Sequence, residues 1–290
     1  MIKKRKFKDL IEHNKWLKKV PNTLTICNSL CGFGAIINTL HVYNKTESAP
    51  EAVFAFSAWL ILFAMIFDAL DGFAARIFNA ASMHGIQMDS LADMVTFGVS
   101  PAVIVAIMGH RYSAEIPYDY NYVWAAGGIY IGCAALRLAT YNVHAILEHK
   151  SDGKFYGLPS PGGAAAICSL VLLYSLKPGE LTQLLPFLPL YTAFLGFLMV
   201  SKVRYAHIGK WVQASKRNKW RFIVIAAVLV SLVWQPVAQF WRKETADIWF
   251  PQFLVVAIIN IYVLSGPVSA LLIKMRLMKD PTAILHPEAE

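Results

Sequence analysis

The chain has 290 residues, of which 57% are hydrophobic and only 16% are charged. A mean hydropathy of +0.47 excludes an ordinary soluble domain and indicates a protein whose surroundings are largely a lipid bilayer. The formal net charge of +9 would suit a nucleic-acid partner, but the basic residues cluster beside long apolar segments, where anionic headgroups and topology explain them. We therefore expect membrane lipids as partners and no nucleic acid.

The first element in chain order is a basic segment over residues 1–20, in which Phe7, Ile11 and Trp16 stand among lysines. This pattern is typical of an amphipathic helix that lies in the headgroup layer of a membrane. A solvated basic tail explains the same pattern equally well. The segment is therefore expected to flank the membrane in one of these two ways.

Eight apolar segments follow, each close to the roughly 20 residues that a membrane-spanning helix needs. They cover residues 22–43, 53–77, 88–109, 121–146, 158–176, 183–201, 221–241 and 250–273. When successive connections are assigned to alternate sides of the membrane, 22 of the 27 lysines and arginines fall on the N-terminal side. Because such residues favour the cytoplasmic side, the pattern predicts an all-α integral membrane protein of eight spans with both termini cytoplasmic.

Four aspartates interrupt the second and third apolar segments. Asp68 and Asp71 lie in the last turns of the second segment, and Asp89 and Asp93 lie in the first turns of the third. An antiparallel helix pair would bring the four carboxylates to one depth near the cytoplasmic interface, on two faces that look at each other. Each ionised carboxylate at membrane depth costs about 2.5 to 3.5 kcal/mol, so the group needs cations.

The side chains nearby supply one cation, Arg76, and two divalent metal ions would balance the remaining charge. Carboxylate ligands select hard ions, which predicts Mg²⁺ or Mn²⁺ with Ca²⁺ as the alternative. A two-metal site of this kind suits phosphoryl transfer. Intramembrane aspartates also bind protons or sodium in transporters, so the charge pattern alone leaves an enzyme and an ion-coupled transporter open.

The acids belong to a longer pattern with fixed spacing. It reads DxxDGxxAR, then eight residues, then GxxxDxxxD, and its members are Asp68, Asp71, Gly72, Ala75, Arg76, Gly85, Asp89 and Asp93. This arrangement resembles the signature of the CDP-alcohol phosphotransferase family, at every position and in its spacing. The resemblance favours an enzyme over a transporter, and it implies a six-helix membrane core in which an acceptor alcohol displaces CMP from a CDP-linked donor.

The resemblance also implies roles for the acids. Asp68, Asp71, Asp89 and Asp93 are the implied metal ligands, and Asp93 is in addition the implied general base for the acceptor hydroxyl. A carboxylate in that role agrees with the need to deprotonate a hydroxyl that is a poor nucleophile at neutral pH.

The small and basic members of the pattern are implied to bind CDP-diacylglycerol. Gly72 and Ala75 would make room for the cytidine, and Arg76 and Gly85 would lie close to the diphosphate. This agrees with general chemistry, because glycine allows close approach to the backbone and arginine can bind a phosphate through two nitrogens.

Flanking segments narrow the resemblance to the phosphatidylserine synthase branch of the family, which implies L-serine as the acceptor. These segments are VPNTLTICNSLCGFGAI, MDSLADMVTFGVSPA, RLATYNV, FYGLPSPGGAAA and LMVSKVRY. Phosphatidylglycerophosphate synthases of the family carry a proline where this chain has Ser90. Because the signature is shared, glycerol 3-phosphate and inositol phosphate stay open as alternative acceptors.

Candidates for the acceptor pocket are Arg137, Ser90 and Thr96, with helix packing as the competing role for Thr96. Arg137 could bind a carboxylate or a phosphate, and a structural pairing with an acid would explain it equally well. Asn28 is a further polar residue near the cytoplasmic end of a span. A zwitterion such as serine needs fewer cations than a phosphorylated acceptor, which agrees with the few basic residues of the first five spans.

The organisation expected from these observations has four parts. They are a juxtamembrane segment (1–20), a catalytic core (21–205), a two-helix extension (206–276) and a cytoplasmic tail (277–290). The resemblance further implies a homodimer in a prokaryotic inner membrane, with the active site facing the cytoplasm.

Overall fold

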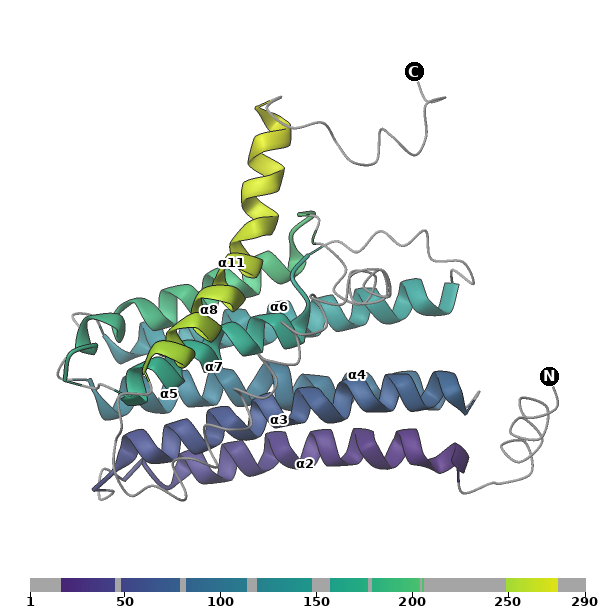
Figure 1. Cartoon of the computed structure of the whole chain (residues 1–290), viewed down its shortest axis with the longest axis horizontal. Helices are drawn as coiled ribbons and strands as arrows, with labels where there is room; N and C mark the ends of the chain where they lie inside the picture. The colour runs from purple at the N-terminus through teal and green to yellow at the C-terminus, as the bar shows by residue number, and fades with distance from the viewer. Residues whose placement is uncertain are drawn as a thin grey trace.

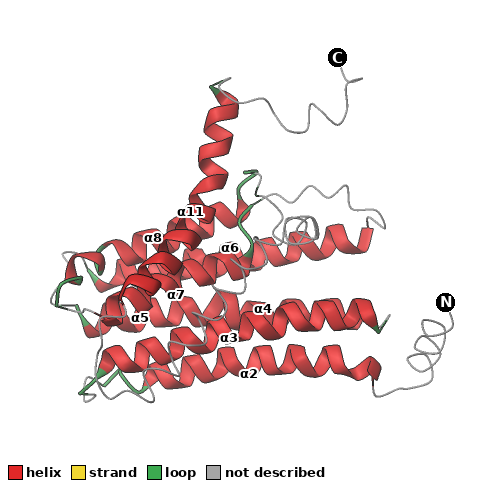
Figure 2. Ribbon diagram, viewed as in Figure 1, coloured by secondary structure: helices red, strands yellow, loops and turns green. Residues whose placement is uncertain are grey.

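The computed structural model describes residues 17–44, 48–78, 82–113, 119–147, 157–176, 179–203, 205 and 249–275. All regular structure in these ranges is helical and they contain no strand, as Figure 2 shows. The predicted span over 221–241, the tail 277–290 and most of the basic segment 1–20 lie outside the described residues.

The helices follow the predicted apolar segments in order. Short helical turns, η1 (Leu17–Lys19) and η3 (Thr182–Leu184), precede two of them. The others are α2 (Val20–Leu40), α3 (Pro50–Ile77), α4 (Met83–Asp93), the π-helical η2 (Met94–Val99), α5 (Ser100–Arg111), α6 (Tyr120–Leu147), α7 (Ser160–Leu176), α8 (Phe187–Val200) and α11 (Trp249–Lys274). The all-helical prediction is confirmed for the described residues.

Five of these helical stretches are long and apolar enough to cross a bilayer. They are Val20–Leu40, Pro50–Ile77, Met83–Arg111, Tyr120–Val143 and Val255–Leu272. Ser160–Leu176 and Phe187–Val200 are apolar but shorter. An integral membrane protein is therefore supported, whereas eight spans and the orientation of the termini stay predictions.

The inner face of α2 shows how these helices pack. Its buried positions carry small or polar side chains at helical spacing, namely Thr25, Asn28, Gly32, Ala35 and Thr39. Large apolar side chains such as Leu30 and Phe33 are more than half exposed, at 61% and 56%. Small residues inside and large ones outside are typical of helices that pack closely in a lipid environment.

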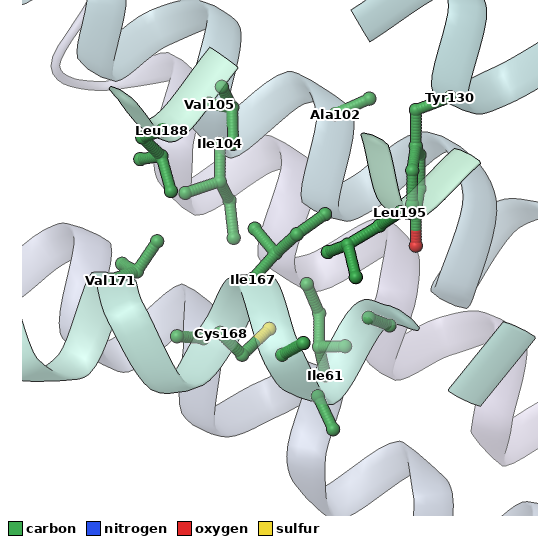
Figure 3. Close-up of a cluster of buried hydrophobic side chains, with 14 of the residues drawn as sticks. Ile61, Ala102, Ile104, Val105, Tyr130, Ile167, Cys168, Val171, Leu188 and Leu195 are labelled. Atoms are coloured by element: carbon green, nitrogen blue, oxygen red, sulfur yellow. The ribbon is translucent and has the colours of Figure 1, made fainter. Parts of the chain in front are cut away.

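The helices from α2 to α8 run roughly parallel or antiparallel to one long axis, and α6, α7 and α8 form a second layer over the first helices (Figure 1). α2 packs along α3, and α6 packs along α8. Between the layers lies an apolar core built from Ile61 of α3, Ile104 of α5, Tyr130 of α6, Ile167 of α7 and Leu195 of α8 (Figure 3). This core holds the helices in a fixed register.

The C-terminal helix α11 packs against α7 and is joined to the core through Tyr205, whose hydroxyl donates to Val263 O at 3.0 Å. Burial, more than the neighbouring Tyr262, raises the pKa of Tyr205 to about 12, so the phenol stays a donor near neutral pH. Figure 1 shows α11 bending away from the bundle. Pro267 lies inside this helix, and a proline there removes a backbone hydrogen bond and permits such a bend.

Candidate active site

We call the end of the bundle at which α2 begins, α3 ends and α4 begins the acidic end, because Asp68, Asp71, Asp89 and Asp93 gather towards it. The opposite end, where α2 ends and α3 begins, is the far end. α2 packs against both α3 and α4 at the acidic end. This arrangement lets aspartates on two different helices approach one another beside a third.

Three of the four carboxylates form a compact cluster. Asp68 and Asp71 of α3 and Asp89 of α4 each offer an oxygen, and these atoms lie within 4.8 Å of one another. Asp71 is buried, and Asp68 and Asp89 are half-buried. Asp93 lies close enough for the charges of Asp68 and Asp89 to act on it. Three of the four acids predicted from the sequence to meet are thus brought together.

Two residues of α2 hold the most buried acids. The Thr25 hydroxyl donates to Asp71 Oδ2 at 2.7 Å, and Asn28 Nδ2 donates to Asp93 Oδ1 at 3.2 Å. Asp71 and Asp93 are only 5% and 8% exposed. Neutral donors of this kind fix the orientation of a carboxylate but leave its negative charge in place.

The donor set fits a hard divalent cation. Asp89 Oδ1 is buried and has no hydrogen-bond partner among the described residues. A buried anionic oxygen without a donor is costly, and like charges this close repel one another strongly in a medium of low dielectric constant. Three convergent carboxylates supply the oxygen ligands that Mg²⁺, Mn²⁺ and Ca²⁺ prefer. The residues therefore match the divalent-cation site that the sequence predicts, without selecting one metal.

Open space adjoins the cluster at Gly72. A Cβ added to this glycine would meet no atom of the described residues within 4 Å. Arg76, one turn later, is exposed, and its Nε donates back to Gly72 O at 2.9 Å. Ala75 between them is half-buried. These positions leave a small-residue surface next to the acids with a guanidinium beside it.

The start of α4 differs from the prediction. The third apolar segment was expected to begin at residue 88, whereas α4 begins at Met83. The Ser82 hydroxyl accepts a hydrogen bond from the Gly85 backbone N–H at 3.0 Å, which is an N-terminal cap. His84 therefore lies in the first turn of α4, where it is exposed. The cap brings Gly85 into the helix one turn before Asp89.

The predicted acceptor residues have different surroundings. The Ser90 hydroxyl donates to Asn142 Oδ1 of α6 at 2.9 Å. Thr96 is fully buried, and its hydroxyl donates to Asn28 O at 3.0 Å, which is a helix-packing contact. Ser90 therefore joins α4 to α6, whereas Thr96 joins η2 to α2.

Two contacts of α6 locate Arg137 along the bundle axis. The Tyr130 hydroxyl donates to Phe97 O at 2.8 Å, which sets the register of α6 against η2, and the Ser90 contact to Asn142 sets it a second time. α6 runs antiparallel to α4 and η2. Counting from Tyr130 to Arg137 along α6, and back by the same number of residues from Phe97, leads to residue 90. The same count from the contact of Asn142 with Ser90 leads to residue 95, so Arg137 lies opposite residues 90 to 95. This interval contains Asp93.

The side chain of Arg137 is anchored on its other side. Its Nη1 donates to Met199 O at 3.3 Å and lies 3.0 Å from the position that a Cβ on Gly157 would occupy. Gly157 has φ of 78°, a conformation that favours glycine, and a Cβ there would also clash with Met199 O. The loop before α7 and the end of α8 thus hold the guanidinium in place.

The contact of Thr25 with Asp71 was not predicted from the sequence. A hydroxyl in an apolar helix is unremarkable by itself, because it can bond to the carbonyl four residues earlier. Pro21 O lies 3.1 Å from the Thr25 hydroxyl as an alternative acceptor to the nearer Asp71. The usable signal was its spacing to Asn28, which places both residues on one helical face.

Comparisons with known proteins agree with this geometry. Residues 18–200 match the family model described as CDP-alcohol phosphatidyltransferase. That range contains every acid of the cluster and ends before α11.

Among similar proteins, a CDP-diacylglycerol–serine O-phosphatidyltransferase of Helicobacter pylori is 32% identical over 189 residues, which is 63% of this chain and 71% of that protein. One of Bacillus subtilis with the same name is 33% identical over 192 residues, covering 66% of this chain and 92% of the relative. One of Saccharomyces cerevisiae is 32% identical over 171 residues, or 57% and 56% of the two chains. The similarity thus extends across bacterial and yeast proteins of one name.

Proposed function

Because the chain belongs to the CDP-alcohol phosphatidyltransferase family, we propose that it transfers the phosphatidyl group of CDP-diacylglycerol to the hydroxyl of L-serine. The products would be phosphatidylserine and CMP. The observation that carries the proposal is the cluster of Asp68, Asp71 and Asp89, in a chain similar to several proteins named for this reaction.

In this proposal the acids divide into two roles. Asp68, Asp71 and Asp89 hold two divalent cations, with Asp93 as a further ligand. The cations would offset the charge of the diphosphate and of the leaving CMP. Asp93 accepts the proton of the serine hydroxyl as its oxygen attacks the phosphorus that bears diacylglycerol, and the bond from that phosphorus to CMP breaks. The burial of Asp93 and its bond to Asn28 support a carboxylate held in one orientation.

The donor nucleotide is proposed to lie on the surface that begins at Gly72. The space beside Gly72 suits a cytidine, with Ala75 as its neighbour. Arg76 and Gly85 would lie near the diphosphate, where the exposed guanidinium can turn from Gly72 O to a phosphate oxygen. Arginine suits this role because its planar donors match phosphate geometry.

The acceptor is proposed to enter beside Arg137. A zwitterionic serine needs one cation for its carboxylate and one acceptor for its ammonium group, and Arg137 at the depth of Asp93 supplies the first. Ser90 lies at the same depth, and Thr96 lies deeper with its hydroxyl already bonded to α2. We therefore favour Arg137 and Ser90 as the residues that contact the acceptor. Thr96 would support the site through its packing contact with α2.

We further propose that the protein lies in a prokaryotic inner membrane as a homodimer of eight-span subunits, with both termini and the active site facing the cytoplasm. The basic residues on one side support this orientation. The four-part organisation expected from the sequence stays part of the proposal, with α11 as the described portion of the two-helix extension.

A panel of acceptors tests the reaction. Purified protein with CDP-diacylglycerol and Mg²⁺ or Mn²⁺ is expected to release CMP with L-serine, and not with glycerol 3-phosphate or inositol phosphate. Radiolabelled serine should appear in phosphatidylserine. Release of CMP with glycerol 3-phosphate alone would move the chain to another branch of the family and contradict the serine assignment.

A further inference from the structure

Two polar residues of α2 contact the acids from behind. Thr25 and Asn28 lie one turn apart on the buried face of the helix. Thr25 donates to Asp71 at 2.7 Å and Asn28 donates to Asp93 at 3.2 Å.

We propose that Thr25 and Asn28 are positioning residues of the cation site, which act through Asp71 and Asp93. The inference rests on the proposed function, because it assumes that these carboxylates bind divalent cations. A carboxylate has two oxygens, and a donor that holds one of them fixes the side-chain torsion and directs the other. Partners of this kind behind metal ligands commonly control affinity for the metal.

The position of Asn28 is itself firmly held. Its backbone carbonyl accepts from the Thr96 hydroxyl at 3.0 Å. One turn further along α2, Gly32 O accepts from the Ser100 hydroxyl at 2.9 Å, and a Cβ on Gly32 would clash with Thr96. α2 and η2 are thus in backbone contact just beyond Asp93. The Asn28 backbone therefore cannot move away from Asp93 without separating these two helices.

The amide of Asn28 directs its N–H side to Asp93 and leaves its own oxygen unpaired among the described residues. The side chain is completely buried, and its Oδ1 has no hydrogen-bond partner among the described residues. Leaving a buried oxygen unpaired is unfavourable. The arrangement is tolerated because the N–H side of the amide is the one that an ionised carboxylate requires, and a bond to a charged group is stronger than a neutral one.

The same helix offers matched controls at the far end. Thr39 donates to the Ser57 hydroxyl at 2.9 Å, and Asn38 Nδ2 donates to the same hydroxyl at 2.9 Å. These residues repeat the chemistry of Thr25 and Asn28 across α2 and α3, but their partners are neutral. Substitutions there remove comparable hydrogen bonds without touching an acid.

The test measures Mn²⁺ binding to the purified full chain in detergent, from the electron paramagnetic resonance signal of free Mn²⁺ and without substrate. We expect Thr25→Val and Asn28→Leu to weaken Mn²⁺ binding roughly 10- to 100-fold. Thr25→Ser, which keeps the hydroxyl, should stay near the wild-type affinity. Thr39→Val and Asn38→Leu should also retain that affinity, although their melting temperatures fall.

Unchanged Mn²⁺ affinity in both Thr25→Val and Asn28→Leu would overturn the inference. So would an equal loss in Thr39→Val and Asn38→Leu, because the effect would then be general loosening of the α2–α3 interface. If Thr25→Val does not fold, the difference between Thr25→Ser and Thr25→Ala decides the matter in the same way.

The assay separates this inference from the proposed function. Wild-type protein that binds Mn²⁺ but releases CMP only with another acceptor would contradict the serine assignment and leave the positioning role intact. Wild-type protein that binds no Mn²⁺ would overturn the positioning role itself.

Discussion

The two ends of the α2–α3 interface use the same side-chain types with different results. At the far end, Asn38 donates to Val53 O and to the Ser57 hydroxyl, each at 2.9 Å, and Thr39 donates to that hydroxyl as well. All of these partners are neutral and belong to the two helices. The network is complete in itself and stabilises the helix pair.

At the acidic end, Thr25 and Asn28 donate to Asp71 and Asp93, and the polar groups do not satisfy one another. Asn28 Oδ1 and Asp89 Oδ1 are buried and without hydrogen-bond partners among the described residues. The comparison teaches that a polar helix interface can serve either packing or a ligand. Unbalanced charge and unpaired buried atoms distinguish the second case from the first.

Removal of divalent cations should have the largest effect on the rate of CMP release, and it should act at the acidic end alone. Exhaustive chelation is expected to abolish CMP release from CDP-diacylglycerol and L-serine, because the clustered carboxylates would then repel the diphosphate. Adding Mg²⁺ or Mn²⁺ should restore the rate. Full activity after chelation, checked by elemental analysis of the protein, would contradict the metal mechanism.

Neutralising single acids should have the next largest effect. Asp68→Asn, Asp71→Asn, Asp89→Asn and Asp93→Asn are each expected to lower the rate of CMP release by about two to three orders of magnitude, as for the loss of a major electrostatic group. Asparagine keeps the size of the side chain, so packing changes little.

The control for these variants is Ser57→Ala at the far end, which removes the hydroxyl that Thr39 and Asn38 share. It should lower the stability in detergent by about 1 kcal/mol and leave the rate of CMP release near that of the wild type. Equal losses of activity at both ends would mean that the acids act through folding.

A smaller effect is expected from Gly72→Ala, which tests the space beside the acids. The new methyl group meets no described atom of the protein, and alanine favours a helix more than glycine does. The fold should therefore be unharmed, while a nucleotide in this space would be displaced and the rate of CMP release lowered about 10- to 100-fold.

Gly128→Ala on α6 is the matched control, since Gly128 is equally free of described neighbours within 4 Å and lies on another helix. It should keep the wild-type rate. An active Gly72→Ala enzyme would show that the cytidine binds elsewhere.

Much of this arrangement could be predicted from the sequence. Uninterrupted apolar length predicted the helices, and the spacing of Asp68, Asp71 and Asp89 predicted their meeting, because helical periodicity and antiparallel connection are local properties. The contacts of Thr25 with Asp71 and of Asn28 with Asp93 depend on how α2 is rotated against α3 and α4. That rotation is set by packing among many residues, such as Gly32 against Thr96, and no short motif encodes it.

The early start of α4 was missed for a different reason. Apolar length locates the part of a helix inside a membrane, but the first turn of α4 contains His84 and Gly85, and its residues are exposed or only half-buried. Its boundary is set by the Ser82 cap, a single residue whose type is common in loops as well. Ser82 nevertheless matters for the site, because α4 carries Asp89.

The smallest expected effect comes from this cap. Ser82→Ala removes the acceptor of the Gly85 N–H and should lower stability by about 1 kcal/mol. Since Gly85 lies one turn before Asp89, fraying of this turn should also reduce CMP release, but by less than Gly72→Ala does. Ser82→Thr, which keeps the hydroxyl, should restore both properties in thermal unfolding and CMP-release assays. A melting temperature and rate for Ser82→Ala equal to those of the wild type would show that packing on α2, and not the cap, fixes the start of α4. In that case the acidic end would depend on the same kind of helix packing as the far end.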